Sequence, residues 1–543
     1  MFGCFYINNV ICTKFHINSS AEGYKHILHF EACLVYQMAL FQWLQESFRQ
    51  FFLFAFILIV LLMKFLLIDK SRKTRSNLPP GPPTIPIIGN LHQLGTMPHL
   101  SLQSLAHKYG PIIYLQLGQI PTVVLSSARL AKEVLKTHDL ALANRPQLFA
   151  AKHLLYNCTD VTFAPYGAYW RHIRKICIHE LLSDKRVHSY SSVREEEVAR
   201  LVRRVAGTYP GTINLSKMLG LYANDVLCHV AFGRDFSEGG DYHRHGFKEM
   251  LDEVQELLGG FSVGDFFPSL EFIHTLTGMK SRMQDTFRRF DQLFDQILNE
   301  HITSEKVEEH KDLVDFLIEV QKNDSDELPL TTDNIKAIIM DMFGAGTDTN
   351  FITLDWVMTE LLMNPKVMEK AQREVRSTVK ERRVVAESDL HQLQYMRALI
   401  KEVLRLHPPT PILVPRESME EIILEGYKIP AKTRVLVNAW AVGRNPESWE
   451  DPNTFKPERF LGSNIDYRGQ DFELIPFGAG RRGCPGITFA TAVIELALAQ
   501  LLYSFDWELP PGTCAEDLDL TEVFGISMYK KESLCVVAKP HFL

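Results

Sequence analysis

Residues 476–486 read PFGAGRRGCPG and are followed by the apolar pattern of a helix. Gly478, Gly480 and Gly483 fit the G-x-G-x-x-G pattern of dinucleotide-binding folds. Only 60 residues of the 543 follow Gly483, too few for the further strands of a doubly wound sheet. The proline that opens the stretch would also interrupt a central strand. We therefore set the dinucleotide interpretation aside.

The same stretch contains a second pattern, F-x-x-G-x-R-x-C-x-G, formed by Phe477, Gly480, Arg482, Cys484 and Gly486. Average composition would produce it by chance in a chain of this length with a probability on the order of 10⁻⁴. The segment resembles the haem-thiolate loop of the cytochrome P450 family, in the form common among plant microsomal A-type members. The resemblance implies haem b as the cofactor, with Cys484 as the axial ligand of the iron.

The chemistry of this loop suits that role. Glycines let a backbone pass close to a flat macrocycle and direct N–H groups at sulfur, and Arg482 can pair with a carboxylate such as a haem propionate. Cys484 precedes a helix N-terminus beside Arg481 and Arg482, and both effects favour the thiolate. A thiolate ligand pushes electron density onto iron and favours O–O cleavage. The alternative for a lone cysteine is an inert buried thiol.

Glu402 and Arg405 form an E-x-x-R pair on one face of a predicted helix that Pro408 terminates, and Arg459 follows in the sequence PERF. Such a pair is usually a solvated i,i+3 ion pair. In the family that this chain resembles, the helix Glu and Arg join the Arg of the later loop in a buried triad. The resemblance therefore assigns Glu402, Arg405 and Arg459 to a structural triad that supports the haem loop.

Residues 334–363 are predicted to form one long helix, with Thr331, Thr332 and Asp333 as candidate caps. Two glycines interrupt its middle, each costing about 1 kcal/mol relative to alanine, so we expect a large group near the backbone there.

That middle segment, GAGTDT at residues 344–349, resembles the oxygen-activation segment of the family, with Ala345, Gly346, Asp348 and Thr349 matching. A hydroxyl beside a carboxylate can hold a water and pass protons while the O–O bond is cleaved, so Asp348 and Thr349 are the predicted catalytic residues. Alternatively, Thr349 bonds only the carbonyl of residue 345. Asn350 replaces the Ser or Thr that often follows.

Trp170 and Arg174 lie four residues apart on one predicted helical face, where a cation–π packing pair is the ordinary interpretation. The W-x-x-x-R pattern of the resembled family instead directs both groups to a haem propionate. Arg416, which follows the sequence HPP, resembles another propionate partner. With Ala345 near the macrocycle, these residues complete the predicted cofactor-binding set.

The resemblance also indicates which regions face a substrate, and their side chains are apolar, as suits a lipophilic small molecule. An apolar stripe is equally what a plain core would show. The predicted pocket residues are Phe149, Leu154, Phe163, Phe343, Ile412, Val414 and Ile526.

Composition agrees with a globular enzyme. Basic and acidic residues number 58 and 65, giving a formal charge of −7, so nucleic acid is excluded as a bulk electrostatic partner. Nine cysteines without C-x-x-C pairs indicate reduced thiols in a cytosol-facing protein. We predict a mainly α protein with small β-sheets, the cytochrome P450 fold, and a single large haem domain. Strands are expected at 112–118 and 122–127, and helices at 193–205, 247–258, 283–301, 334–363, 390–406 and 487–503.

Residues 51–68 are apolar except for Lys64, long enough to cross a bilayer, and followed by a basic cluster at residues 70–75. The positive-inside rule then places the body in the cytosol. We predict a leader or upstream extension over residues 1–40, where Asn18 could be glycosylated, and one membrane anchor over 48–68. A basic stop and proline-rich hinge would follow over 69–83, then a cytosolic catalytic domain over 84–543, on the endoplasmic reticulum membrane.

The resemblance implies an activity that inserts one oxygen atom of O₂ into a lipophilic plant metabolite such as a terpenoid, alkaloid or phenylpropanoid. Electrons would come from NADPH through NADPH-cytochrome P450 reductase, and we expect a monomer. The alternatives are a haem-thiolate isomerase or dehydratase without reductase, and a non-enzymatic haem sensor. A basic patch for the reductase, which could equally be a solvated face, comprises Arg171, Lys175, Lys185, Arg186 and Arg481.

Overall fold

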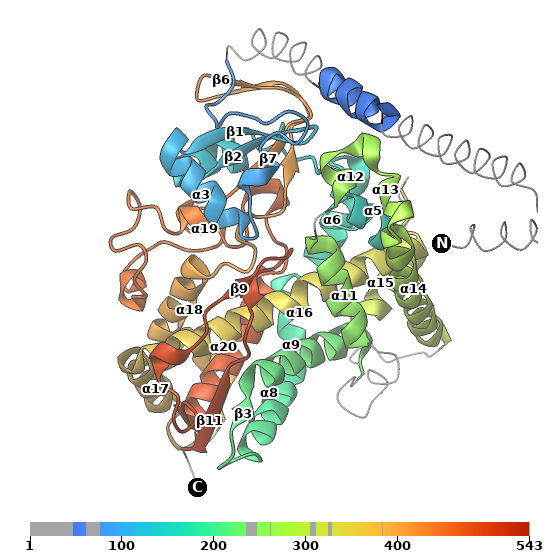
Figure 1. Cartoon of the computed structure of the whole chain (residues 1–543). Coiled ribbons are helices and arrows are strands. Elements are labelled where there is room, and N and C mark those ends of the chain that lie inside the picture. Colours follow the sequence, from blue (N-terminus) through green and yellow to red (C-terminus); the bar gives the residue numbers. More distant parts are fainter. Residues whose placement is uncertain are drawn as a thin grey trace, which may run out of the picture. The chain divides into compact units, whose positions relative to one another are not determined.

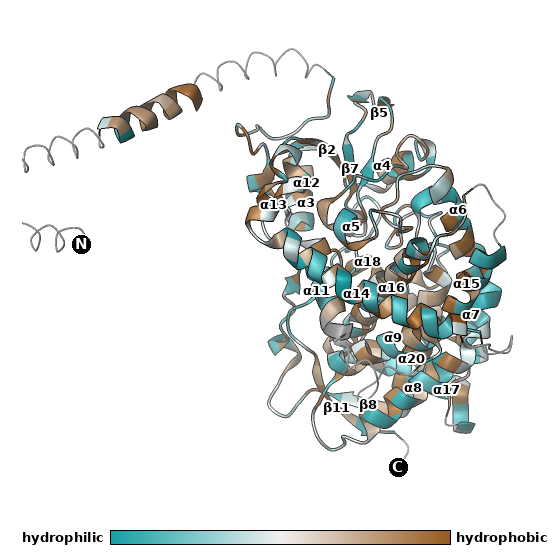
Figure 2. Cartoon of the chain, turned by 90° about the vertical axis from the view of Figure 1, so that its right-hand side faces the viewer, coloured by the Kyte–Doolittle hydropathy of each residue, from teal (hydrophilic) through white to brown (hydrophobic). Residues whose placement is uncertain are grey.

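The computed structural model describes residues 47–60, 77–234, 247–260, 262–303, 311–323, 328–382 and 384–541. The chain divides into two compact units, Met1–Ser76 and Asn77–Leu543. In the first unit the described part is the helix Ser47–Val60, whose apolar side chains are mostly exposed and appear brown in Figure 2. The predicted leader and residues 61–68 of the predicted anchor lie outside the described residues.

The larger unit begins at Asn77, earlier than the predicted boundary at residue 84. The Tyr114 N–H donates to the Pro80 carbonyl at 2.8 Å, and the Asn90 amide donates to the Pro83 carbonyl at 3.2 Å. These bonds fasten the proline segment to strand β1, Ile112–Leu117. The C-terminal end of the proline-rich segment is therefore bonded to the larger unit.

Helix α16, Thr332–Met363, crosses the body as the long yellow helix of Figure 1. The Thr331 hydroxyl accepts from the Asn334 N–H at 3.2 Å and the Asn334 side chain accepts from the Thr331 N–H at 3.0 Å. This capping box selects Thr331 among the three candidate caps. Pro365 starts the next helix, α17, directly after the C-cap. Helices α9, Leu215–Phe232, and α20, Ile487–Ser504, pack against α16.

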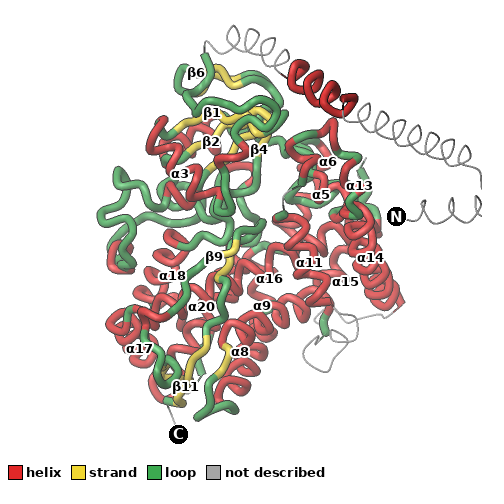
Figure 3. Tube along the Cα trace, viewed as in Figure 1, coloured by secondary structure: helices red, strands yellow, loops and turns green. Residues whose placement is uncertain are grey.

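Four small sheets stand beside the helices, and Figure 3 shows the largest at one end of the body. Its strand order is β1-β2-β7-β4. The predicted pair forms an antiparallel hairpin in which Ile112 faces Leu125. The strands are β1 Ile112–Leu117, β2 Ile120–Leu125, β3 Ile213–Asn214, β4 Arg416–Glu417, β5 Ile422–Leu424, β6 Tyr427–Ile429, β7 Arg434–Val437, β8 Phe505–Glu508, β9 Glu522–Val523, β10 Tyr529–Lys530 and β11 Cys535–Pro540.

The predicted helices are present, but two of them start away from the expected position. Helix α14 begins at Met279 and not at residue 283. Residues Glu387–Gln392 form a separate 3-10 helix, so the helix expected from residue 390 begins at Gln394. The remaining α-helices are α3 Pro98–Tyr109, α4 Ala128–Lys132, α5 Phe149–Leu154, α6 Ala168–Ile176, α7 Asp184–Ser189, α8 Ser191–Ala206, α11 Phe247–Gly259, α12 Val263–Phe266, α13 Ile273–Leu276, α14 Met279–Thr303, α15 Leu313–Asn323, α17 Pro365–Val379, α18 Gln394–Leu406 and α19 Ala439–Val442.

Within the described residues, α20 is the one helix long and apolar enough to cross a membrane. Most of it is buried, because it packs on α16, α17 and α8 at the centre of the main hydrophobic cluster. It is therefore a core helix, and it carries the cysteine loop at its N-terminus.

Candidate active site

A cavity of about 280 Å³ lies between α16 and the cysteine loop. Its wall contains Cys484 on one side and Ala345 and Thr349 on the other. Further wall residues come from α11, from the segment after α5 and from the stretch after α18. The sequence places these elements hundreds of residues apart, and the fold brings them around one space.

Cys484 is held by the backbone of its own loop. Its N–H donates to the Phe477 carbonyl at 2.9 Å, and its Sγ accepts from the Gly486 N–H at 3.3 Å. The exposed surface of Cys484 faces the cavity inside the body. Burial raises the pKa of the Cys484 thiol, and the Gly486 N–H and Arg174 oppose that shift. The nearby cation that favours thiolate is thus Arg174, not the expected Arg481 or Arg482.

The backbone conformation and the close protein neighbours of Gly480 both require a glycine at this position. Its φ is +69°, and a Cβ there would stand 2.2 Å from the Leu135 carbonyl oxygen and 2.8 Å from the Asp139 carboxyl group. The close neighbours of Gly480 within the polypeptide, Leu135 and Asp139, are therefore sufficient by themselves to require a glycine there. The Gly486 N–H, in contrast, does point at sulfur as expected.

Arg482 is buried and directed at backbone carbonyls. Its Nε donates to Ala143 at 2.7 Å, and its terminal nitrogens donate to Val161 at 3.3 Å and Ala164 at 2.6 Å. Its guanidinium carbon lies 4.1 Å from the Trp170 ring centre. Three of the five N–H groups of the arginine are therefore used within the protein, and the rest remain available to a group in the cavity.

The three other residues expected near a propionate have different surroundings. The Trp170 indole N–H donates to the Val161 carbonyl at 2.9 Å, so the indole N–H points at the segment that follows α5. Trp170 does not line the cavity. Arg174 lines the cavity and donates to the Gly483 carbonyl. Arg416 also lines it, with bonds of 2.7 Å to Asp139 and 2.9 Å to the Ala479 carbonyl.

Arg145, which the sequence analysis did not single out, joins Arg174, Arg416 and Arg482 in the cavity wall. Burial, together with repulsion from Arg416 and Arg174, lowers the pKa of Arg482 to about 9. Burial also raises the pKa of the neighbouring Asp160 carboxyl well above its usual range, so this group compensates little positive charge. Buried cations need partners. A cluster with this excess of guanidinium groups fits a ligand that carries carboxylates, as haem does.

The opposite wall is the middle of α16. The Thr349 hydroxyl donates to the Ala345 carbonyl at 2.7 Å, which is the backbone bond left open as an alternative for this residue. Ala345 and Gly344 line the cavity, and a Cβ on Gly344 would meet nothing within 4 Å. The glycine therefore leaves open space beside the helix. Asp348 is half-buried next to Thr349 and is not among the wall residues.

Glu402, Arg405 and Arg459 bond one another in the body of the protein. The two Glu402 oxygens accept from Arg405 at 2.7 and 2.8 Å, and Arg459 donates to Glu402 at 3.0 Å. Arg405 also donates to the Gly443 and Pro452 carbonyls at 2.6 Å each. The E-x-x-R pair is thus a buried, fully bonded group and not a solvated surface pair.

Three of the predicted pocket residues, Phe163, Val414 and Ile526, line the cavity, and the other four do not. Phe343 stacks on Phe232 at 5.0 Å, because two residues along a helix turn the side chain to the face opposite Ala345. Phe149 stacks on His274 at 4.2 Å.

The remaining two predicted pocket residues are also buried elsewhere. Leu154 is fully buried in the main hydrophobic cluster, and Ile412 packs on the cluster beneath the sheet. Wall residues that the sequence analysis missed include Val254, Gln255 and Leu258 of α11 and Asp341 of α16. The helical period of α11 was visible, but nothing local shows which face meets the cavity.

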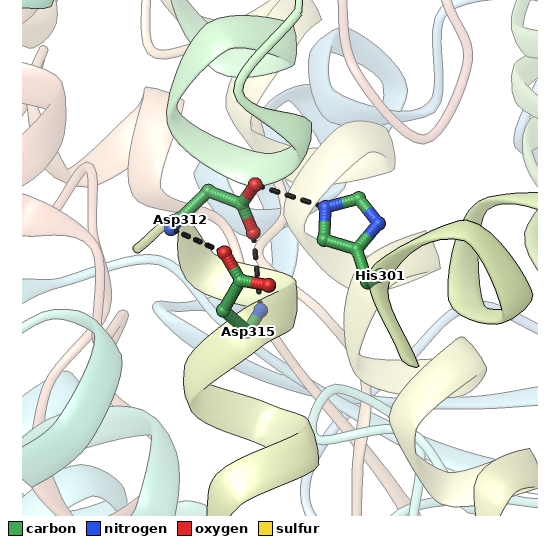
Figure 4. Close-up of side chains that lie close together, drawn as sticks. All are labelled: His301, Asp312 and Asp315. Carbon is green, nitrogen blue, oxygen red and sulfur yellow. Dashed lines mark hydrogen bonds and ion pairs between the residues drawn. The ribbon is translucent and has the colours of Figure 1, made fainter. Parts of the chain in front are cut away.

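A second cluster contains atoms that could ligate a metal, and it is the one such group among the described residues. His301, at the end of α14, points at Asp312, and Asp312 and Asp315 bond each other at the start of α15 (Figure 4). Both ring nitrogens of His301 face acceptors, the Ile297 carbonyl at 2.7 Å and Asp312 at 2.9 Å. These atoms are occupied in fastening α14 to α15, so the cluster is a structural joint.

A cysteine thiol that faces a cavity, four guanidinium groups in the cavity wall and a threonine on the helix opposite are the features of a haem-thiolate site. The family model for cytochrome P450 matches residues 79–536, and the chain belongs to the cytochrome P450 family.

Relatives extend over nearly the whole chain. The chain is 73% identical to cytochrome P450 71AP13 of Prunus mume over 506 residues, covering 93% of this chain and 98% of that one. It is 46% identical to strychnine-11-hydroxylase of Strychnos nux-vomica, covering 90% and 97%. A zebra fish cytochrome P450 structure with abiraterone matches with a TM-score of 0.72 and 28% identity, covering 83% of this chain and all of that one.

The fold and family confirm the predicted plant cytochrome P450 with monooxygenase activity. Haem is the cofactor, O₂ the cosubstrate, and electrons come from NADPH through a redox partner. Nothing in the comparisons favours the isomerase or sensor alternatives.

Proposed function

We propose that this monooxygenase hydroxylates a lipophilic plant specialised metabolite, with Cys484 as the axial ligand of haem iron. The observation that carries the assignment is the position of Cys484 Sγ, held by a Gly486 N–H at the start of α20 and facing the cavity opposite Thr349. When bound, the haem activates O₂ so that one oxygen atom enters the substrate and the other leaves as water.

The residues of α16 handle protons and water at the distal wall. Thr349 rests on the Ala345 carbonyl at 2.7 Å, and rotation of its hydroxyl would let it hold a water beside Asp348. The two residues are consecutive on the helix, and the open space beside Gly344 and Ala345 would admit oxygen and substrate next to Thr349. Arg174, Arg416, Arg145 and Arg482 would hold the propionates, and the Glu402–Arg405–Arg459 triad would support the loop from below.

The ligand assignment is tested with the reduced, carbon-monoxide-bound absorption spectrum of the membrane fraction. The unmutated chain is expected to give a thiolate-type Soret band, and Cys484→Ser is expected to lose it because a serine hydroxyl does not supply a thiolate. Cys514→Ser is the matched control, since Cys514 is exposed and absent from the cavity wall. A thiolate band in Cys484→Ser would overturn the assignment.

The substrate class follows from the wall of the cavity. Leu155, Leu227, Val254, Leu258 and Ile338 are among its members, and the chain is similar to proteins named strychnine-11-hydroxylase and premnaspirodiene oxygenase. Turnover of a terpenoid and alkaloid panel, dependent on NADPH and reductase, is expected. Turnover without reductase would contradict a monooxygenase reaction.

We place the chain as a single-pass, monomeric protein of the endoplasmic reticulum membrane, with the catalytic body in the cytosol. The helix Ser47–Val60 supports this because most of its apolar side chains are exposed, Phe51 and Phe54 by more than 60%, as lipid contact requires. Basic residues follow it in the sequence. Carbonate extraction should leave the full chain in the pellet.

The redox partner is proposed to be NADPH-cytochrome P450 reductase, bound on a basic surface formed by Arg171, Lys175, Lys185 and Arg481. These four side chains are exposed. Arg186, included in the prediction, packs at 3.4 Å on the Phe316 ring and is excluded from the surface.

Charge reversal tests this surface. Lys175→Glu is expected to slow first-electron reduction about three- to tenfold at low salt, with the difference shrinking at high salt. Lys108→Glu on α3, also at an exposed lysine, is the control. Equal reduction rates for the two variants would remove the surface from the proposal.

A further inference from the structure

Asp160, in the segment between α5 and α6, carries a buried carboxyl group that the proposed reaction does not use. The residue is 0% exposed. Its Oδ2 accepts from the Phe163 N–H at 2.8 Å, and its Oδ1 has no N–H or O–H donor among the described residues. The group that it contacts is a second carboxyl, that of Asp341 on α16. Because carboxylates can only accept hydrogen bonds, this contact requires a proton between the two groups.

Asp341 is the member of the pair that is stabilised as a carboxylate. Its Oδ2 accepts from the Val161 and Thr162 N–H groups at 2.6 and 3.1 Å, and such bonds favour the ionised form. Burial raises the pKa of the Asp341 carboxyl only to about 6, whereas it raises the pKa of Asp160 well above the usual range. Near neutral pH, Asp160 is therefore the acid, and Asp341 accepts its proton in a hydrogen bond.

The turn that follows Asp160 lies between this pair and the guanidinium groups of the cavity wall. The Val161 carbonyl accepts from Arg482 at 3.3 Å, and the Thr162 carbonyl accepts from Arg145 Nε at 2.9 Å. The charge of Asp160 acts on both of these arginines. An ionised Asp160 would therefore give them a counter-charge from inside the protein, and a protonated Asp160 does not.

Three further titratable side chains near the pair are neutral at the same pH. Burial raises the pKa of the Cys158 and Cys177 thiols to about 12, and it also raises the pKa of the Tyr169 hydroxyl. Arg174 adds a positive charge beside the other arginines. The protonation state of Asp160 thus decides whether the arginines are balanced by the protein or by a bound ligand.

We propose that Asp160 holds a proton, which it donates to Asp341, and that this proton leaves the guanidinium groups of Arg145 and Arg482 available to the carboxylates of haem. This inference rests on the proposed haem site. A charged Asp160 would compete with those carboxylates for the same two arginines and would repel them. Asp160 is therefore a positioning residue that acts through the arginines.

The proposal links haem binding to pH. The haem carboxylates neutralise the arginines, so they raise the pKa of Asp160 in the loaded protein above its value in the haem-free protein. A group with a higher pKa in the loaded state gives its full contribution to binding at low pH and loses it as the pH rises. Above the pH range in which Asp341 titrates, haem affinity should therefore fall with increasing pH.

Infrared spectroscopy of the haem-loaded full chain locates the proton. A protonated carboxylic acid has a C=O stretching band apart from those of carboxylates, and the unmutated protein is expected to show one that Asp160→Asn lacks. Asparagine keeps both contacts, since its NH₂ donates to Asp341 and its oxygen accepts from the Phe163 N–H. Asp389→Asn is the matched control, because Asp389 is also buried but accepts from Arg382 at 2.8 Å. This control should keep the band.

Haem release gives a second measurement, followed in the Soret region as haem moves to an excess of haem-free myoglobin. Release from the unmutated chain is expected to become about three- to tenfold faster between about pH 6.5 and about pH 8.5. Release from Asp160→Asn should change less than about twofold over that range, because the amide cannot ionise. Titration of Arg482 affects both proteins alike.

A carboxylic acid band that is the same in the unmutated and Asp160→Asn proteins would overturn the proposal, and so would equal pH profiles of haem release. Asp341→Asn is a second variant: it places an NH₂ donor against Asp160, so the band should disappear at a lower pH than in the unmutated protein. An unchanged titration of the band in Asp341→Asn would also contradict the shared proton. If the unmutated chain gives no thiolate-type Soret band, the haem assignment itself fails, while the infrared band still reports on Asp160.

Discussion

The cysteine loop and the glycine-bearing turn of α16 face each other across one cavity. A glycine is needed in these two places for opposite reasons. A Cβ on Gly480 would collide with the Leu135 carbonyl at 2.2 Å, whereas a Cβ on Gly344 would meet nothing within 4 Å. The loop glycine is therefore required by contacts inside the polypeptide. The helix glycine is required by nothing in the polypeptide, and it keeps a space open.

This difference separates two kinds of constraint on the site. The position of the thiol is determined by the protein fold, since Cys484 bonds Phe477 and Gly486 and the adjacent Arg482 bonds three carbonyls. On the opposite wall, formed by the middle of α16, the shape is determined by the ligands that must fit beside the helix. Substitutions in the loop should therefore affect folding and haem binding, and substitutions in the helix should affect ligands and chemistry.

Gly480→Ala is expected to have the largest effect. The left-handed φ costs alanine about 1–2 kcal/mol, and displacing the Leu135 backbone adds a further amount of about 1–3 kcal/mol. We expect a chain with little thiolate-type Soret band and a lower unfolding temperature. The measurements are the haem content per chain and thermal unfolding.

Gly462→Ala is the control for that variant. Gly462 has a φ of +72° like Gly480, but a Cβ there would meet nothing within 4 Å. It should lose only the conformational part, about 1 kcal/mol, and keep its haem. Equal damage in both variants would mean that φ, and not the contact with Leu135, governs the loop.

Asp341→Ala is expected to come next, because Asp341 joins the two walls. It accepts from the Val161 and Thr162 N–H groups at 2.6 and 3.1 Å, and the Val161 carbonyl in turn accepts from Arg482. Removing the carboxyl leaves two backbone donors unpaired, at about 1–3 kcal/mol each, so we expect a total loss of about 2–6 kcal/mol. Chemical denaturation of the haem-loaded protein measures it.

Asp341→Asn keeps one oxygen that can accept from both N–H groups and should recover most of the stability. If Asp341→Asn loses as much stability as Asp341→Ala, the negative charge of the carboxylate, and not its oxygen as an acceptor, holds the segment of Val161 and Thr162. Burial raises the pKa of the Asp341 carboxyl to about 6, which already disfavours the charged form. The neutral amide should therefore match the unmutated carboxyl best below about pH 6, where that carboxyl is itself protonated, and less well above it.

The contrast between the walls also explains what the sequence could predict. The cysteine loop and the Glu402–Arg405 pair are local patterns, and their fixed spacing survives folding, so the sequence was sufficient to place them. The proline-rich segment was predicted to be a hinge, and its hydrogen bond to Tyr114, more than thirty residues further along the chain, could not be predicted from it. Short patterns do not reveal such distant partners.

The distal wall was predicted less well for the same reason. Phe343 was expected in the pocket because it is apolar and close to Ala345 in sequence, but the helix turns it onto Phe232. Gln255 could not have been found, since its partner Gly344 is 89 residues away. A wall built from separate elements depends on tertiary packing, and only the structure shows which side chains it includes.

Thr349→Val tests the helix side without disturbing the fold. Valine has nearly the same shape but cannot donate to the Ala345 carbonyl or hold a water. We expect an unchanged thiolate-type Soret band and stability within about 1 kcal/mol, with product formation falling by about 10²-fold. Normal product formation by Thr349→Val would remove the hydroxyl from the proton path.

Gly344→Ala should have the smallest effect on the fold, and of opposite sign to Gly480→Ala. Alanine in a helix interior is favoured over glycine by about 1 kcal/mol, and no neighbour opposes the new methyl group. Thermal unfolding should therefore show a small gain in stability, while bulky imidazoles bind more weakly because the methyl group occupies cavity space. Gly346→Ala is the comparison, since the new Cβ would stand 3.3 Å from the Leu227 side chain. This variant should gain less stability than Gly344→Ala. A loss of stability in Gly344→Ala would mean that the space beside α16 is already filled by the protein.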